Sequence, residues 1–190
     1  MLTAARSRIA AGLRKVLPGR LTRRFVRQQS GAAAVEFALV ATPFLALTFA
    51  ILETAFVFFA GQTLEAATAD SARLIMTGQA QSAGYSANDF KNAVCARIYG
   101  LFDCANGITV NVQTYSSFAS VNTTPPITNG QFNTTNMGYN PGTNPGDITV
   151  VQLYYQWPIY VSMLGDNLST LNGNNRLLAA TAVFRVEPYK

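Results

Sequence analysis

Residues 35–60 read VEFALVATPFLALTFAILETAFVFFA, an apolar run interrupted only by two acids, one proline and three threonines. At about 1.5 Å per residue, a helix of this length measures roughly 39 Å and exceeds the ~30 Å hydrocarbon core of a bilayer. The rival interpretation is a cleavable secretory signal, but its apolar region spans only about 7 to 15 residues. The small residues Ala32 to Ala34 also precede the run instead of following it. The stretch therefore predicts a single retained transmembrane helix.

The charges on either side of this run predict its orientation. Eight of the 14 Lys and Arg residues lie before Gly31, where no acid occurs, so the remainder has six bases against nine acids. Basic residues beside a span are held in the cytoplasm, which predicts a cytoplasmic N-terminus and an extracytoplasmic C-terminal domain. Because the basic residues adjoin a membrane span instead of forming a soluble recognition face, binding to nucleic acid is not expected.

The helical pattern continues beyond the apolar run. Leu64, Ala67 and Ile75 recur on one side of a helix, together with Ser71 or Ala72. Gly78 and the segment 82–84 supply stop signals. We expect a helix from about Ala32 to about Gly78, whose outer third is an amphipathic stalk that requires something to pack on.

The remaining residues predict a small α+β domain. Ser86 with Asp89 three residues on is a variant of the capping box, and it opens a second, shorter helix within residues 85–102. Three runs rich in β-branched and aromatic residues follow, at 108–118, 148–160 and 177–186, and they favour a small antiparallel sheet of about three strands. Between the first two, residues 119–147 are dense in Asn, Thr, Gly and Pro and predict an exposed loop, either functional or simply solvated. The expected organisation is a basic leader over 1–31, a transmembrane and stalk helix over 32–80, and an α+β head over 81–190.

Residue inventory limits the chemistry. The chain has no histidine, which excludes a His-based triad and most zinc sites, and we expect no enzyme activity, metal, cofactor or small-molecule substrate. Its two cysteines, Cys95 and Cys104, lie after the span and would meet an oxidising compartment, so a disulfide is expected. A straight helix would separate their Cα atoms by about 13 Å, so the chain must turn back near Gly100 or Asp103.

Glu36 lies at the cytoplasmic edge of the apolar run, where an unpaired carboxylate is costly. A basic segment, then Gly31, then a glutamate five residues later at the start of an apolar helix resembles a type IV prepilin. The resemblance implies that a membrane aspartyl peptidase cuts after Gly31, leaving Ala32 as the first residue of the mature chain. Glu36 can then neutralise the new amine of a neighbouring subunit, which offsets the desolvation of both groups. Ala32 stands where type IVa pilins commonly begin with phenylalanine, so that class fits less well.

Residues 28–79 resemble the TadE-like domain of minor pseudopilins in tight-adherence (Tad/Flp) pilus systems. The resemblance rests on Gly31, the core AAVEFAL, Pro43, Glu53, residues 62–67, Ala72-Arg73 and Thr77-Gly78, with weaker support from residues 184–189. It implies a pilin-like head, a bacterial inner-membrane location with the head in the periplasm, and incorporation into a surface pilus. The implied partners are a prepilin peptidase and other pilins or pseudopilins of the Tad system. Assembly and register are expected to depend on Glu36, Phe37, Pro43 and Glu53.

Several alternatives stay open. Pro43 either kinks the span or is a tolerated membrane proline without a role. Glu53, about 25 Å beyond Glu36 along the helix, is either a second contact between subunits or an interfacial carboxylate that reaches water. The whole chain is alternatively an uncleaved, membrane-anchored binding or adhesion protein. A TadG-like protein is a further alternative, although such proteins are usually longer.

Overall fold

The computed structural model of this chain describes residues 29–98, 100, 101, 103–161 and 168–189. Most of the predicted basic leader therefore lies outside the described residues. The chain forms two compact units, Met1–Leu45 and Ala46–Lys190, which we describe separately.

Helix α2, Gln29–Met76, is the long helix that the apolar run predicts. It continues through Pro43 without a break in its assignment. The threonine hydroxyls of the apolar run bond within the helix: Thr42 Oγ1 donates to Ala38 O at 2.7 Å and Thr54 Oγ1 donates to Ala50 O at 2.9 Å. Because these hydroxyls are satisfied internally, they do not oppose a lipid environment.

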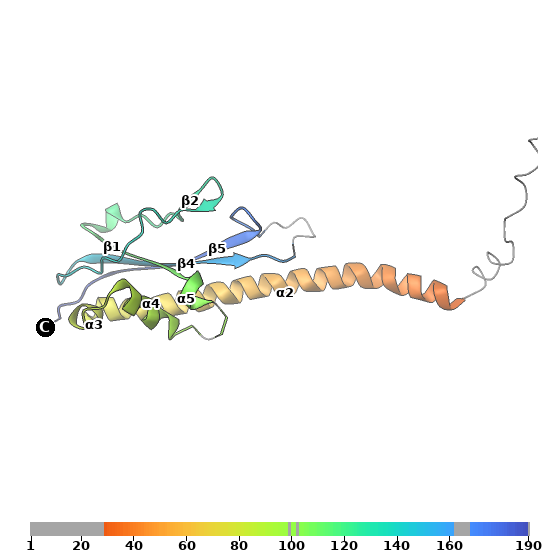
Figure 1. Ribbon diagram of the computed structural model, residues 1–190, viewed down its shortest axis with the longest axis horizontal. Helices are drawn as coiled ribbons and strands as arrows, with labels where there is room; N and C mark the ends of the chain where they lie inside the picture. Colours follow the sequence, from red (N-terminus) through yellow and green to blue (C-terminus); the bar gives the residue numbers. More distant parts are fainter. Residues whose placement is uncertain (1–28, 99, 102, 162–167, 190) are drawn as a thin grey trace, which may run out of the picture. The chain divides into compact units, whose positions relative to one another are not determined.

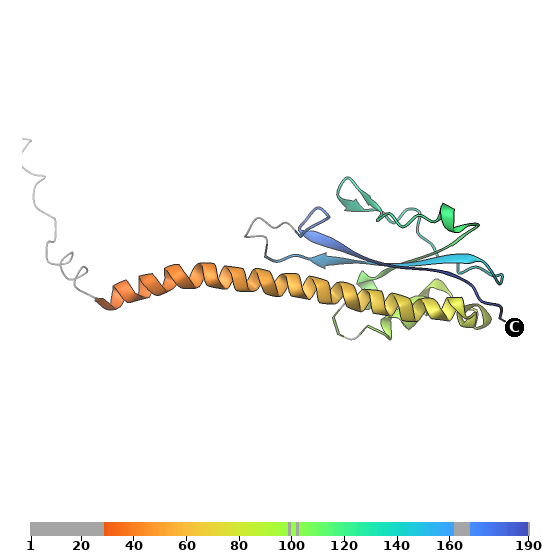
Figure 2. The same ribbon diagram turned by 180° about the vertical axis from the view of Figure 1, so that it is seen from behind.

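The second unit contains the predicted antiparallel sheet. Its strands are β1 (Thr109–Tyr115), β4 (Ile148–Pro158) and β5 (Asn175–Arg185), in the spatial order β1-β4-β5. Within this unit, α2 runs along one face of the sheet, and the segment that carries β2 lies over the opposite face (Figures 1 and 2). The α+β class with a long N-terminal helix is therefore confirmed.

The core of the second unit lies between α2 and the sheet. The helix contributes the apolar face that the sequence predicts, with both Ser71 and Ala72 buried. Strands β4 and β5 contribute alternate residues, since successive side chains of a strand point to opposite faces. The buried cluster includes Val57, Ala60, Leu64, Ala67, Ala72 and Ile75 from α2, and Val112, Val151, Leu153, Leu178 and Ala180 from the sheet.

The second predicted helix is present but shorter than expected. Helix α4 covers Ala87–Cys95, and its Ser86 and Asp89 form the complete reciprocal capping box. The hydrogen bonds from Ser86 hold the pKa of the Asp89 carboxyl below its ordinary value. Phe90 and Val94 are completely buried in the core. Two one-turn helices flank α4: α3 (Gln79–Ser82) and α5 (Cys104–Gly107).

The C-terminal segment packs against the C-terminal end of α2. Gly78 has φ +76°, a conformation that favours glycine, and a Cβ at this position would lie 2.1 Å from Cγ of Tyr189. Tyr189 also donates from its hydroxyl to Thr143 O at 2.9 Å, and the Glu187 N–H donates to Met76 O at 2.8 Å. The last residues of the chain therefore satisfy one of the free carbonyls at the helix end.

The segment 119–147, which the sequence predicts to be an exposed loop, contains short regular elements. It begins within a 3₁₀ turn at Phe118–Ser120, and it contains the short strands β2 (Ile127–Thr128) and β3 (Gln131–Phe132), which pair antiparallel. Its far end adds to the edge of β1, where Val112 N donates to Gly138 O and Asn140 N donates to Val112 O, both at 2.8 Å. More than half of its residues are exposed, and its order comes from this backbone pairing, which composition does not report.

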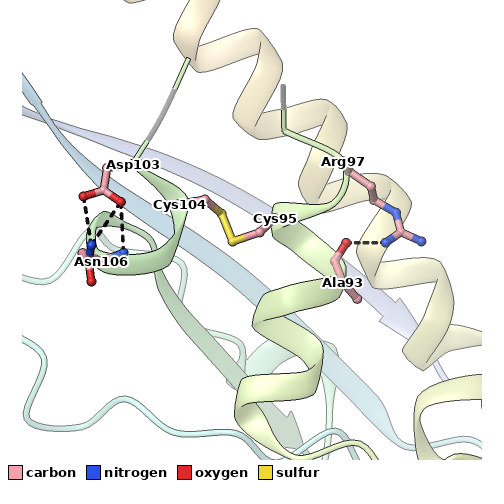
Figure 3. The surroundings of a disulfide bond; sticks show 6 residues. All are labelled: Ala93, Cys95, Arg97, Asp103, Cys104 and Asn106. Atoms are coloured by element: carbon pink, nitrogen blue, oxygen red, sulfur yellow. Dashed lines mark hydrogen bonds between the residues drawn. A yellow bond between two sulfur atoms is a disulfide. The ribbon is translucent and has the colours of Figure 1, made fainter. Parts of the chain in front are cut away.

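Cys95 and Cys104 form the expected disulfide, with their Cα atoms 5.6 Å apart. The bond joins the last residue of α4 to the first residue of α5 (Figure 3). The chain turns back between them, and Gly100 adopts φ +65° in this turn. Asp103 caps α5 by accepting a hydrogen bond from the Asn106 N–H at 3.3 Å.

We predict that replacing both cysteines by alanine lowers the free energy of unfolding of the second unit by about 2–3 kcal/mol, since the bond closes a short loop and restricts the unfolded chain. The measurement is urea unfolding of the full chain in detergent micelles, followed by circular dichroism. Reduction of the wild-type protein should give the same loss and should have no effect on the variant. An unchanged midpoint in both experiments would contradict a stabilising role.

Candidate functional site

The N-terminal part of α2 exposes its apolar side chains on every side. All described side chains from Gly31 to Val40 are exposed, and Phe37 retains 74 % of its accessible surface. Such an all-round apolar helix requires a nonaqueous environment. The large exposed apolar residues of α2 are Val35, Phe37, Leu39, Val40, Phe44, Leu45, Leu47, Phe49, Ile51, Leu52, Phe56, Phe58 and Phe59.

Length and hydropathy show that α2 is suited to cross a membrane. Gly31–Met76 is the one described helix that is long and apolar enough, with a mean hydropathy of 2.1 in its most apolar window. None of that window is buried within the structure. The helix thus fits a single-pass membrane protein.

Gly31 and Ala32 lie in the first turns of α2. A Cβ at Gly31 would meet no described atom within 4 Å. Glycine is less favourable than alanine in a helix by about 1 kcal/mol. Neither close packing within the described chain nor a positive φ therefore explains the glycine at this position.

Glu36 is exposed among apolar side chains on the same part of the helix. Within the described part of the chain, no hydrogen bond or ion pair reaches its carboxylate, whereas other polar side chains of α2 bond locally. An ionised carboxylate in an apolar environment is costly unless a cation pairs with it. A partner for it lies outside the described residues, and lipid headgroups, water and another chain are candidates.

Glu53 differs from Glu36 both in its burial and in its hydrogen bonds. Its side chain retains only 8 % of its accessible surface, and its two carboxylate oxygens accept hydrogen bonds from the backbone N–H groups of Tyr160 and Val161. These residues follow β4 directly, so the carboxylate joins the helix to the end of the central strand. Glu53 does not reach water through its side chain, which was one of the two expectations for it.

The partners of Glu53 could not be found from the sequence. The hydrogen bonds cross 107 and 108 residues, and backbone N–H groups carry no sequence signature. The local signal for this site was the acid itself. It lies on the helix face that is buried one turn later, at Val57. A role for Glu53 between subunits, like those of Phe37 and Pro43, stays a prediction.

Tyr160 lies beside this junction with 82 % of its surface exposed. Tyrosine is enriched where apolar and aqueous phases meet, because its ring and hydroxyl suit both. Its position next to Glu53 coincides with the place where α2 changes from exposed to partly buried. Among the described residues, no group of three or more Cys, Asp or Glu side chains could hold a metal ion.

We predict that Glu53→Ala weakens the attachment of the β4 end to α2, because two backbone N–H groups lose a charged acceptor worth about 1.5–3 kcal/mol per bond. Amide hydrogen exchange at Tyr160 and Val161 should accelerate by at least about tenfold, which corresponds to about 1.4 kcal/mol. Glu65→Ala is the matched control, since this exposed acid on the same helix bonds only to Gln62 at 3.2 Å. Equal exchange in both variants and the wild type would refute the attachment.

Comparison with known proteins adds one positive finding. No curated protein and no solved structure matches the chain. Residues 31–73 match the family model described as TadE-like protein. The match begins at Gly31 and includes both Glu36 and Glu53. It identifies residues 31–73 as a TadE-like segment and is consistent with a TadE-like protein of Tad pilus systems.

Proposed function

We propose that this chain is a minor pseudopilin, a structural subunit in the biogenesis of a Tad/Flp pilus, processed by a prepilin peptidase after Gly31. The observation that carries the proposal is the contrast between the two acids of α2. Glu53 is fully engaged within the chain, whereas Glu36 lies in an exposed apolar helix without a partner among the described residues. An acid that is unpaired in the isolated chain is suited to pair with a cation of a neighbouring subunit.

Gly31 supports the processing step. Neither packing nor φ within the described chain calls for glycine at this position. A peptidase that reads the residue before the cut supplies a reason for it. Cleavage would place an amine on Ala32, four residues before Glu36, and the amine of one subunit would pair with the carboxylate of the next.

The second unit supports a minor role in the pilus. Its helix α2 buries one face under the sheet while Phe56, Phe58 and Phe59 on the same stretch stay exposed. The helix therefore offers apolar surface for packing against other helices even where the head covers it. TadE-like proteins are a structural, pilus-associated family, and the match over residues 31–73 supports a structural role in this proposal.

The orientation is part of the proposal. The basic residues before Gly31 favour a cytoplasmic N-terminus, which leaves the sheet and its disulfide in the periplasm. An oxidising compartment is where a disulfide persists. Tyr160 would then lie at the outer membrane–water boundary of the inner membrane.

The first test determines the N-terminus of the chain purified from membranes of strains with and without the prepilin peptidase. Intact mass and terminal sequencing should show Ala32 first only when the peptidase is present. A retained Met1 in both strains would sink the proposal and favour the uncleaved, membrane-anchored binding protein.

A pair of glycine variants sharpens this test. Gly31→Leu should abolish cleavage without affecting the fold, because the side chain meets open space. Gly61→Leu is the matched control, since a Cβ there also meets no described atom within 4 Å on the same helix. Loss of cleavage in both variants would point to a general disturbance of α2 rather than to recognition of Gly31.

A further prediction concerns assembly. Glu36→Gln should leave cleavage intact and lower incorporation into sheared pilus fractions or into crosslinked complexes by at least about tenfold, because breaking a desolvated ion pair costs about 3–5 kcal/mol. Glu65→Gln, a neutralised exposed acid on the same helix, should incorporate like the wild type. Normal incorporation of Glu36→Gln would show that this carboxylate does not pair across subunits.

A further inference from the structure

A cavity of about 510 Å³ lies on the face of the sheet that is turned away from α2. Its floor consists of β1 and β4 residues, and its roof is the segment 122–137 that carries β2 and β3. This volume falls within the range of about 300–1,000 Å³ that small-molecule sites occupy. None of the residues that line the cavity belongs to the TadE-like segment, and the cavity has no part in the proposed processing or assembly.

The lining is polar but uncharged. None of the described residues around the cavity is an acid or a base. Burial raises the pKa of the Tyr154 hydroxyl above its ordinary value, so this phenol also stays neutral. A cavity without charge gives no ion pair to an anionic or cationic ligand. Its ligand should therefore be neutral.

A network of amides forms the floor. Asn111 and Gln152 are direct partners across β1 and β4, and Asn111 Nδ2 donates to Gln152 Oε1 at 2.9 Å. Asn111 Oδ1 in turn accepts from Gln113 Nε2 at 3.1 Å and from the Gly138 N–H at 3.0 Å. These bonds fix the orientation of all three amides.

The network leaves the Nε2 group of Gln152 and the Oε1 atom of Gln113 without a partner among the described residues. Gln152 retains only 4 % of its surface and lines the cavity, yet no described group accepts a hydrogen bond from its Nε2. Likewise, no described group donates to Gln113 Oε1. These two groups are therefore available to hydrogen-bond a hydroxyl that enters the cavity.

Apolar atoms complete the lining. Pro125, Ile127 and Met137 face the cavity from its roof, and Tyr154 lies in its floor. Oriented amides together with proline, methionine and aromatic surface suit a ligand that has both hydroxyl groups and C–H faces. That combination is characteristic of saccharides.

An extended peptide fits less well. Peptides commonly bind by adding a strand to a free sheet edge. At the β1 edge, the N–H and carbonyl of Val112 are already paired with Gly138 and Asn140. The cavity presents the face of the sheet, where side-chain amides are available and backbone groups are not.

From these observations we infer that the cavity between β1, β4 and the 122–137 segment binds a neutral saccharide, held by Gln152 Nε2 and Gln113 Oε1. The site would give the head a recognition function in addition to its place in a pilus. Gln113 and Asn136 are the residues to vary, since Gln113 is only half-buried and Asn136 is exposed.

The test measures binding of maltotriose, cellotriose and chitotriose to the full chain in nanodiscs, by saturation-transfer NMR. Nanodiscs avoid the sugar headgroups of common detergents. At least one trisaccharide should bind with a Kd of about 1 mM or tighter, equivalent to about −4.1 kcal/mol or better, and anionic trigalacturonate should bind at least tenfold more weakly. Gln113→Ala, which removes an acceptor, and Asn136→Trp, which fills the cavity, should each weaken binding by at least about tenfold.

Matched controls lie outside the cavity. Gln131→Ala lies within the 122–137 segment and Asn144→Trp lies beyond it; both alter exposed amides that do not line the cavity, and both should leave the Kd unchanged. The inference is overturned if none of the three neutral trisaccharides binds, if the control variants lose binding equally, or if only a Pro- and Asn-rich peptide binds. N-terminal processing of the variants is measured in parallel, and its persistence would show that the saccharide result is independent of the proposed function.

Discussion

The second unit depends on the burial of one face of α2 under the three-stranded sheet. Leu64, Ala67 and Ile75 lie on that face and are almost completely shielded from solvent. Each fully buried aliphatic side chain contributes about 1.5–3 kcal/mol, so this interface outweighs any single polar contact in the molecule. All three strands provide the opposing surface, with Val112 from β1, Leu153 from the central strand β4 and Leu178 from β5. The short helices α3, α4 and α5, the disulfide and the C-terminal segment all pack around this helix–sheet interface.

The two parts of α2 differ in how far their side chains are exposed. Before Glu53 none of its described side chains is buried, and beyond Glu53 one face is covered by the head. Glu53 lies at the transition and bonds to the backbone just after β4. A carboxylate that accepts two backbone N–H groups satisfies both partners, so the head begins at a defined place on the helix. The position of the head relative to a membrane surface would follow from this junction.

The two faces of the sheet also differ in chemistry. The face toward α2 is aliphatic and closed, whereas the opposite face carries Asn111, Gln113 and Gln152 beneath the 122–137 segment. Strand alternation makes this division possible, since neighbouring residues of β1 point to opposite sides. One strand pair therefore supports both packing of the stalk and a polar cavity.

Much of this architecture follows from the sequence alone. Residues 35–60 predict the long helix, Ser86 with Asp89 predicts the start of α4, and three β-rich runs predict the sheet, because these signals are local and periodic. Gly31 and Glu36 are likewise visible as a local spacing. Only the tertiary structure decided the partners of Glu53, the order within residues 119–147 and the amide network of Gln152. Those contacts join backbone groups and side chains that are far apart in the chain, and a single sequence carries no pattern for such pairings.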